Sequence, residues 1–387
     1  MSAAEYLGGM DARSQDDRTT EGGALAALGW SPRWEALFGE AVQRGDGEAA
    51  PHLRPGRVVR TDRGSVLVAT ENGVVRAQPS AHLRRKASGP QDLPVTGDWV
   101  MVDPAPTHEV ALVEALLPRS SAFMRGDSGA VSTVQVLATN VDTVFVVHPI
   151  AEAPNLRRIE RELALAWDSG AVPVVVLTKA DLSLGVDAAR DAVESVALGV
   201  DVVVTSAVEG EGIDALGSYA TKGRTVALIG PSGAGKSTLV NALVGADMQA
   251  TREVREKDGK GRHTTVVREI VPLPGGGALL DTPGMRALVL TDAEEGISVA
   301  FSDIVELAGG CRFRDCTHAS EPGCAVQAAV DRSELAPERL ESWHKLRREA
   351  EVAAMKTDAR LRAEEVRKWR IIHKSVRNHP KYRRPDG

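Results

Sequence analysis

A glycine-rich segment at residues 230–238 has the residue types and spacing that bind nucleotide phosphates. It reads G-P-S-G-A-G-K-S-T and fits G-x-x-x-x-G-K-[ST] at every fixed position, between the apolar run TVALIG and the helical pattern KSTLVNALV. Its backbone N–H groups and the helix N-terminus would attract phosphate oxygens. We expect Lys236 to contact the β- and γ-phosphates and Ser237 to bind Mg²⁺. The predicted loop consists of Gly230, Pro231, Ser232, Gly233, Ala234, Gly235, Lys236, Ser237 and Thr238.

A second element predicts which base is bound. Thr178, Lys179, Ala180 and Asp181 follow the run VPVVVL and resemble the N-K-x-D element of GTPases, with Thr in place of Asn. The Asp181 carboxylate can accept two hydrogen bonds from guanine, a donor pair that adenine lacks, and an unpaired buried carboxylate is costly. Ser206-Ala207 follows the next strand and matches the S-A element behind the guanine ring. Together, the T-K-A-D and S-A elements favour GTP over ATP as the ligand. Taken alone, T-K-x-D could instead be a helix cap after a strand.

The D-x-x-G element follows the strand pattern ALLD. Asp281 would hold Mg²⁺ through water, and the N–H of Gly284 would meet the γ-phosphate. In the preceding loop KDGKGRHTTVVRE, the hydroxyl of Thr264 or Thr265 could complete the Mg²⁺ coordination. Many GTPases carry a water-orienting Gln directly after D-x-x-G, but Met285 stands here. We therefore expect slow intrinsic hydrolysis.

All three cysteines of the chain lie in one short segment. Cys311-x₄-Cys316-x-His318-x₅-Cys324 offers three thiolates and one imidazole, which suit tetrahedral Zn²⁺. Four protein ligands leave no open position, so the predicted zinc is structural. The alternative is three unrelated buried thiols.

Composition limits the class of protein. The chain has 387 residues, a formal charge of −6 and only 4% aromatic residues, which argues against a general polyanion binder or a broad base-stacking surface. We find neither an 18-residue apolar run nor a secretory signal, so we expect no membrane span and a cytoplasmic protein. The basic stretch 360–384, opposed only by Glu364 and Glu365, fits contact with RNA phosphates or a solvated helix.

The pattern of elements predicts three domains. Residues 1–50 form an extension and linker, and five short strand patterns in 51–118 suggest an oligonucleotide-binding (OB)-like β-barrel. Buried strand patterns alternate with helices in 119–290, typical of a P-loop α/β domain, and residues 291–387 read as a helical zinc-binding domain with a basic tail. The helices expected in the α/β domain span 156–168, 187–198, 213–219 and 236–245.

The order of the motifs is permuted. An ordinary GTPase runs phosphate loop, D-x-x-G, N-K-x-D, S-A, whereas here T-K-A-D and S-A come first. The same sheet can form if the chain enters and leaves it elsewhere. The chain then leaves the GTPase domain just after D-x-x-G, directly into the zinc-binding domain.

A permuted GTPase between a five-stranded barrel and a Cys/His cluster closely resembles the ribosome small-subunit-dependent GTPases (RsgA/YjeQ). The resemblance covers about residues 53–345 and depends on the motif order, G-P-S-G-A-G-K-S-T, G-R-H-T-T and the metal cluster. It implies GTP/GDP, Mg²⁺ and one structural Zn²⁺, the small ribosomal subunit and its rRNA as partners, and a role in late assembly of that subunit. It also implies that His263 replaces the missing glutamine; the alternative is a surface or RNA-contacting histidine.

Two other functions stay open at this point, and a free-standing monomer is the default expectation. In the first, the chain is a GTP-gated RNA-binding placeholder in which hydrolysis only times release. In the second, it is a P-loop ATPase or kinase, against which Asp181 argues.

Overall fold

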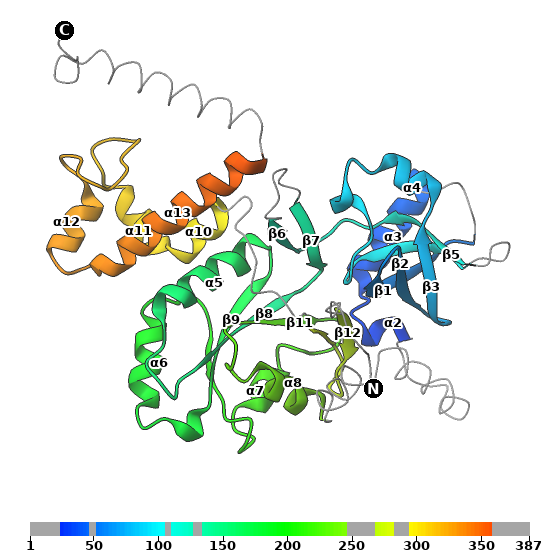
Figure 1. The fold of residues 1–387 in the computed structure, drawn as a ribbon, viewed down its shortest axis with the longest axis horizontal. Coiled ribbons are helices and arrows are strands. Elements are labelled where there is room, and N and C mark those ends of the chain that lie inside the picture. Colours follow the sequence, from blue (N-terminus) through cyan, green and yellow to red (C-terminus); the bar gives the residue numbers. More distant parts are fainter. Residues whose placement is uncertain are drawn as a thin grey trace, which may run out of the picture.

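The computed structural model describes residues 24–45, 52–104, 110–126, 134–245, 268–281 and 294–357. Figure 1 shows an N-terminal β-barrel, a central sheet with helices on both faces, and a C-terminal group of helices. This architecture confirms the fold class expected from the sequence. In the described part of the chain, none of the helices is both long and apolar enough to cross a membrane.

The barrel closes because its first strand pairs with two other barrel strands, one along each edge. β1 pairs antiparallel with both β2 and β4, and β3 pairs parallel with β5. Inward-facing valines such as Val58, Val68 and Val100 are fully buried in its interior. The strands are β1 (Arg54–Asp62), β2 (Ser65–Thr70), β3 (Gly73–Pro79), β4 (Trp99–Asp103) and β5 (Ala111–Leu116).

Two short helices before the barrel pack against it. They are α2 (Ala24–Ala27) and α3 (Pro32–Arg44), which are separate helices because Gly29 adopts φ 100° and Pro32 starts a new helix. Trp30 and Trp34 lie on Trp99 of β4, with ring centroids 4.9 and 5.7 Å away. Residues 24–45 therefore pack on the barrel through the core cluster that contains Trp99.

The basic triplet Arg84, Arg85 and Lys86 lies in a helix of the barrel domain. It forms the last turn of α4 (Ala81–Lys86), whose N-cap Ser80 accepts a hydrogen bond from the Leu83 N–H. A single turn, η1 (Pro90–Asp92), follows it.

The central domain is a mostly parallel sheet with the order β10-β9-β8-β11-β13-β12, in which only β12 is antiparallel. Alternate residues of β8 face opposite layers: Val144 and Val146 share a core cluster with α5, whereas Phe145 and Val147 share one with α7 and α8. This two-sided burial explains the continuous apolar runs. The strands are β8 (Thr143–Pro149), β9 (Val172–Thr178), β10 (Val202–Val204), β11 (Thr225–Ile229), β12 (Glu269–Pro272) and β13 (Ala278–Asp281).

The expected helices of this domain are present. They are α5 (Leu156–Asp168), α6 (Val186–Glu194), α7 (Ile213–Gly217) and α8 (Lys236–Val244), with a turn η2 (Ala180–Leu182). A separate hairpin, β6 (Ala122–Gly126) with β7 (Val134–Thr139), leads from the barrel into the sheet. The barrel also joins the sheet directly, through one antiparallel residue pair between Arg60 of β1 and Glu269 of β12.

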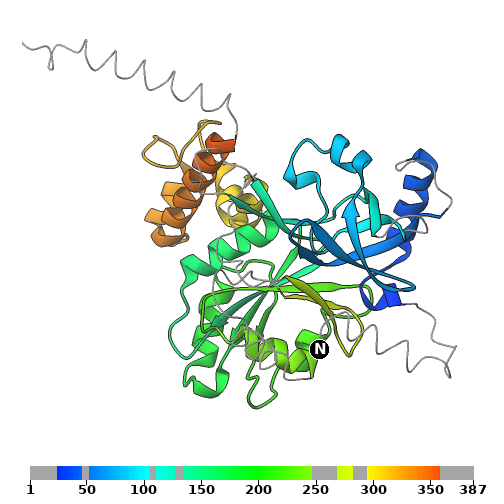
Figure 2. The ribbon, with the colours of Figure 1, turned by 45° about the vertical axis from the view of Figure 1, so that its right-hand side comes forward.

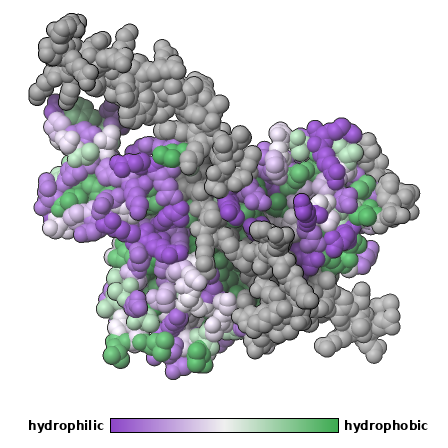
Figure 3. Space-filling model, viewed as in Figure 1, coloured by the Kyte–Doolittle hydropathy of each residue, from purple (hydrophilic) through white to green (hydrophobic). Residues whose placement is uncertain are grey.

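The C-terminal helices are docked on α5 (Figure 2). α10 approaches α5 closely at Gly296, where a Cβ would lie 2.5 Å from the Ala164 carbonyl oxygen. α13 carries two ion pairs to α5, Arg157–Glu341 and Arg161–Glu349. Figure 3, viewed as Figure 1, shows a largely hydrophilic surface where α13 and α5 lie. The helices are α10 (Glu294–Ala300), α11 (Ser302–Ala308), α12 (Ala325–Asp331) and α13 (Pro337–Thr357).

Arg339 lies at the centre of this contact, with only 5% of the residue exposed. Its guanidinium donates to Asp303 at 2.5 and 2.8 Å, to Glu160 of α5 at 2.9 Å and to the Ala300 carbonyl at 3.0 Å. Burial lowers the pKa of Arg339, but the hydrogen bonds and charges of Asp303 and Glu160 outweigh it and raise the pKa. The C-terminal helices are thus held on the central domain by a paired buried charge.

Candidate functional site

The glycine-rich loop joins β11 to α8 at the carboxyl edge of the parallel sheet. Gly230 has φ 141° and lies against β8, where a Cβ would come 2.2 Å from the Val147 carbonyl oxygen. Gly233 and Gly235 adopt φ 77° and 86°, in the left-handed region that glycine occupies without strain. The loop therefore needs its glycines both for close packing and for its turns.

Lys236 opens α8 and folds back over the loop. Its ammonium donates to the carbonyls of Gly230 at 2.8 Å and Pro231 at 2.5 Å. Gly235 caps the helix without a side chain, so no side-chain oxygen competes for the N–H groups of the first turn. The Lys236 ammonium and the first N–H groups of α8 therefore lie at the same end of the helix, beside the glycine-rich loop.

The predicted guanine element, residues 178–181, contacts the glycine-rich loop through Thr178. Its hydroxyl donates to the Ala234 carbonyl at 2.6 Å and lies 3.3 Å from the His148 carbonyl. Although Thr replaces the usual Asn, a direct hydrogen bond therefore connects the end of β9 to the loop, 56 residues away. Lys179 follows with φ 62°, an uncommon conformation for a non-glycine residue, and this turns the chain into η2.

Asp181 and Ser206 come together, although 25 residues separate them. The Ser206 hydroxyl donates to Asp181 Oδ1 at 2.8 Å and accepts the Glu209 N–H at 3.2 Å. Ser206 is fully buried, Ala207 is half-buried and Asp181 is exposed. The serine thus orients one carboxylate oxygen and leaves the group accessible to a ligand.

Asp281 ends β13, directly beside the strand that leads into the loop. β13 pairs in parallel with β11, with Leu280 opposite Ala227, so the backbone of Asp281 reaches the same carboxyl edge. The predicted residues His263, Thr264, Thr265 and Gly284, and Met285, lie outside the described residues.

A buried histidine beneath the loop was not predicted from the sequence. His148, near the end of β8, has 2% of its surface exposed, and its Nε2 lies 2.7 Å from Glu162 Oε2 on α5. Arg158 donates to the other oxygen of Glu162 at 3.0 Å. The only sequence signal is the pair Arg158 and Glu162 at i,i+4 on α5. These contacts connect α5 to β8. The carbonyl of His148 in turn contacts Thr178 at the end of β9.

The four predicted metal ligands converge between α11 and α12. The ligand atoms of Cys311, Cys316, His318 and Cys324 all lie within 4.8 Å of one another. His318 Nδ1 is 3.6 Å from Cys311 Sγ and 3.5 Å from Cys324 Sγ, and these two sulfurs are 3.9 Å apart. Zinc bond lengths in a tetrahedron give edges of about 3.5 Å for N···S and about 3.8 Å for S···S. The donor set therefore fits one structural Zn²⁺.

The pKa values of the four residues and the N–H groups around the sulfurs are also consistent with a metal site. Burial lowers the pKa of His318 and keeps it in the neutral form that binds metal. Desolvation and the neighbouring sulfurs of Cys324 and Cys311 raise the pKa of Cys316 to about 11, and a bound cation would favour the thiolate forms of the cysteines. N–H groups of Ala325 and Gln327 point at Cys311 and Cys324, both at 3.4 Å, as supporting groups do around metal ligands.

Comparison with known proteins identifies the family. A sequence model described as RsgA GTPase matches residues 116–291. The Small ribosomal subunit biogenesis GTPase RsgA of Streptomyces avermitilis is 47% identical over 349 residues, covering 89% of this chain and 91% of that protein. RsgA 2 of Lactiplantibacillus plantarum is 44% identical over 76% of this chain and 82% of its own length.

Two solved structures have the same fold. The crystal structure of YjeQ from Thermotoga maritima has a TM-score of 0.58 and 28% identity, covering 77% of this chain and 98% of that one. YloQ, described as a circularly permuted GTPase, has a TM-score of 0.56 at 23% identity, covering 78% and 96%; this likeness concerns the fold alone. The chain belongs to the RsgA GTPase family and is a GTP-hydrolysing enzyme.

Proposed function

We propose that this GTPase acts in the biogenesis of the small ribosomal subunit, as a cytoplasmic monomer that contacts the subunit and its rRNA. The names of its relatives support the subunit as the target. The basic stretch 360–384, which lies outside the described residues, supplies charge for RNA phosphates. Three free cysteines in one metal cluster suit a reducing compartment.

The observation that carries the proposal is the joined nucleotide site. Thr178 connects the guanine element to the glycine-rich loop at 2.6 Å, and Ser206 orients Asp181 at 2.8 Å. In our proposal Asp181 accepts two hydrogen bonds from guanine, while Lys179, Ala180 and Ala207 line the base site. The base and the phosphates are then held by parts of the sheet that are already in contact.

For hydrolysis, we assign phosphate binding to the loop N–H groups and Lys236. Mg²⁺ would neutralise charge on the β- and γ-oxygens when bound. The Mg²⁺ ligands would be Ser237, Asp281 through a water molecule, and Thr264 or Thr265. The Gly284 N–H would contact the γ-phosphate, and His263 would orient or deprotonate the attacking water in place of a glutamine.

The first experiment is phosphate release from GTP and from ATP, each with and without purified small ribosomal subunits. We expect release from GTP only, rising by at least tenfold with subunits. Asp181→Asn should remove the preference for GTP, whereas the exposed Asp187→Asn on α6 serves as a matched control and should not. ATP turnover as fast as GTP would overturn the role of Asp181. Unchanged GTP turnover with subunits would instead favour a GTP-gated placeholder.

His263 is tested separately. A catalytic histidine contributes roughly 10²–10⁴-fold, so His263→Ala should lower subunit-stimulated kcat by that factor and leave GTP affinity unchanged. A loss of subunit binding at unchanged kcat would show that His263 contacts the particle instead.

A further inference from the structure

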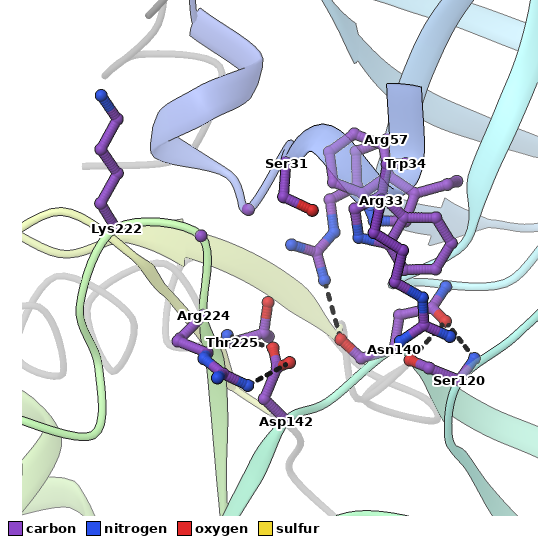
Figure 4. A pocket seen from close by; sticks show the side chains of 13 residues that line it. Ser31, Arg33, Trp34, Arg57, Ser120, Asn140, Asp142, Lys222, Arg224 and Thr225 are labelled. Atoms are coloured by element: carbon purple, nitrogen blue, oxygen red, sulfur yellow. Dashed lines mark hydrogen bonds and ion pairs between the residues drawn. The ribbon is translucent and has the colours of Figure 1, made fainter. Parts of the chain in front are cut away.

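A polar cavity of about 300 Å³ lies where the N-terminal helices, the barrel and the central sheet meet. We name it the junction cavity; Figure 4 shows it from close by. Its lining includes the amino end of β11 at Thr225, whereas the glycine-rich loop follows the opposite end of that strand. The junction cavity is therefore separate from the nucleotide site.

Arg57 of β1 is the central side chain of the junction cavity. Only 1% of it is exposed. Its guanidinium donates to the backbone carbonyls of Leu28 and Asn140, the latter at 3.1 Å, and lies over the Trp99 ring with its carbon 5.0 Å from the ring centroid. Its Nε makes no hydrogen bond. A buried cation is normally paired with a carboxylate, but among the described residues none forms an ion pair with Arg57.

The charge around Arg57 is positive. Arg33, Lys222 and Arg224 also line the junction cavity, against one carboxylate, Asp142. That carboxylate is already engaged, because it accepts the Thr225 N–H at 2.8 Å and an Arg224 N–H at 3.3 Å. Burial lowers the pKa of Arg57 to about 10, although Asp142 and Asp98 raise it from a distance. The cation is thus retained at neutral pH without full compensation.

The N-terminus of α3 adds to this field. α3 is 13 residues long, and its N-cap Ser31 lines the junction cavity without making a side-chain capping bond. Helix N-termini favour anions. In Figure 4 Ser31 lies above the Arg57 guanidinium, which points toward Asn140, while Asp142 and Arg224 approach from the central domain.

We propose that the junction cavity binds a small phosphate-class oxyanion, either inorganic phosphate or a phosphomonoester. The anion compensates the buried Arg57 charge, and Arg33 and Arg224 contact it from opposite walls. Because these walls come from the N-terminal helices and from the central domain, the bound anion stabilises the barrel against the GTPase sheet.

The test uses the full-length protein saturated with a non-hydrolysable GTP analogue and Mg²⁺, so that the β- and γ-phosphate positions of the glycine-rich loop are occupied. Inorganic phosphate is titrated in by calorimetry, and AMP in a parallel experiment. We expect one saturable site. Equal affinities identify the phosphate group as the ligand, and tighter AMP binding identifies a phosphomonoester.

Substitutions locate the site. Arg57→Met should weaken the affinity by at least tenfold, and Arg33→Gln or Arg224→Gln by about three- to tenfold, since charge-assisted hydrogen bonds are lost. Arg33 and Arg224 are exposed, so their variants test the proposal even if Arg57→Met fails to fold. Arg63→Gln, an exposed turn residue of the same barrel, should bind as the original chain. Absence of saturable binding of both anions, or unchanged affinity in both exposed variants, would overturn the proposal.

Discussion

Two buried arginines lie at the two junctions of the central domain, and they are compensated in opposite ways. Arg339 donates to two carboxylates, Asp303 and Glu160. Arg57, at the junction with the barrel, donates to backbone carbonyls, with no carboxylate partner among the described residues. The pKa of Arg339 is accordingly raised, whereas burial lowers that of Arg57 to about 10.

The two junctions differ in whether carboxylates of the chain balance the buried arginine charge. Both arginines pack on an aromatic ring, with the guanidinium carbon 4.7 Å from the Phe301 centroid for Arg339 and 5.0 Å from Trp99 for Arg57. Stacking is therefore common to both, and the carboxylates make the difference. A junction whose charges are balanced within the chain needs no ligand; one with an uncompensated cation attracts an anion.

Zinc removal should produce the largest effect, and only at the Arg339 junction. Structural zinc contributes roughly 10–16 kcal/mol of apparent binding free energy in zinc-finger peptides, so its loss should unfold the segment around α11 and α12. α11 carries Asp303, and the Arg339 contact would loosen with it. Hydrogen exchange of residues 302–331 before and after chelation, with metal content measured, tests this. Barrel amides are the control; undiminished protection of α12 in metal-free protein would contradict it.

Arg339→Met should follow in size. Removing one partner of a buried pair leaves carboxylates uncompensated and costs about 3–5 kcal/mol. Denaturant unfolding measures the loss. Arg332→Gln breaks an exposed pair with Glu334 and should leave the free energy of unfolding nearly unchanged, because water screens an exposed ion pair. Equal losses in the two variants would remove the basis of the comparison.

Arg57→Met should cost less than Arg339→Met. Two carbonyls lose a donor, at about 1–3 kcal/mol for each buried group left unsatisfied. Removal of the uncompensated charge offsets part of this cost. The same unfolding experiment, run with and without phosphate, sharpens the contrast: phosphate should stabilise the original chain but not the variant. A larger loss than that of Arg339→Met would reverse the assigned roles.

The smallest effect on stability is expected for the surface pair Tyr219 and Asp201, where a single carboxylate shifts the pKa of its partner. Tyr219 donates to Asp201 at 2.7 Å, and this hydrogen bond raises its pKa to about 12 from 10.0. The folded state binds the phenolic proton more tightly, so this contribution to stability is present below pH 10 and is lost as the pH rises through about 12. Ultraviolet titration of Asp201→Asn should return the midpoint toward 10. Tyr219→Phe identifies the signal, and a midpoint unchanged by Asp201→Asn would exclude the carboxylate as the cause.

Local patterns in the sequence predicted most of the fold. The helix at 156–168 matches α5 because its apolar spacing is clear and Asn155 caps it, and the buried runs predicted the parallel strands. The β6–β7 hairpin was missed because its short strands carry a bulge at Phe123 and Met124 that interrupts any alternation. The break between α2 and α3 was missed because a left-handed glycine decides it.

The predicted nucleotide and zinc sites rest on local sequence patterns, whereas the contacts around them do not. The glycine-rich loop spans residues 230–238, and the four predicted zinc ligands lie within residues 311–324, so the local spacing of residues is enough to suggest both. His148 with Glu162, Arg339 with Glu160, and Arg57 with Asn140 depend on residues far apart in sequence. These residues come together only in the folded chain, and no local sequence pattern predicts the pairs.

The permuted strand order also has a consequence for synthesis of the chain. β8, β9 and β10 are made first, but β8 must pair with β11 on its other side, and β11 ends only at Ile229. Until then the emerging half-sheet exposes an apolar strand edge, which is prone to pairing with other chains. We expect the barrel to fold first on the ribosome and the central sheet to close late, once β11 and β13 have left the exit tunnel.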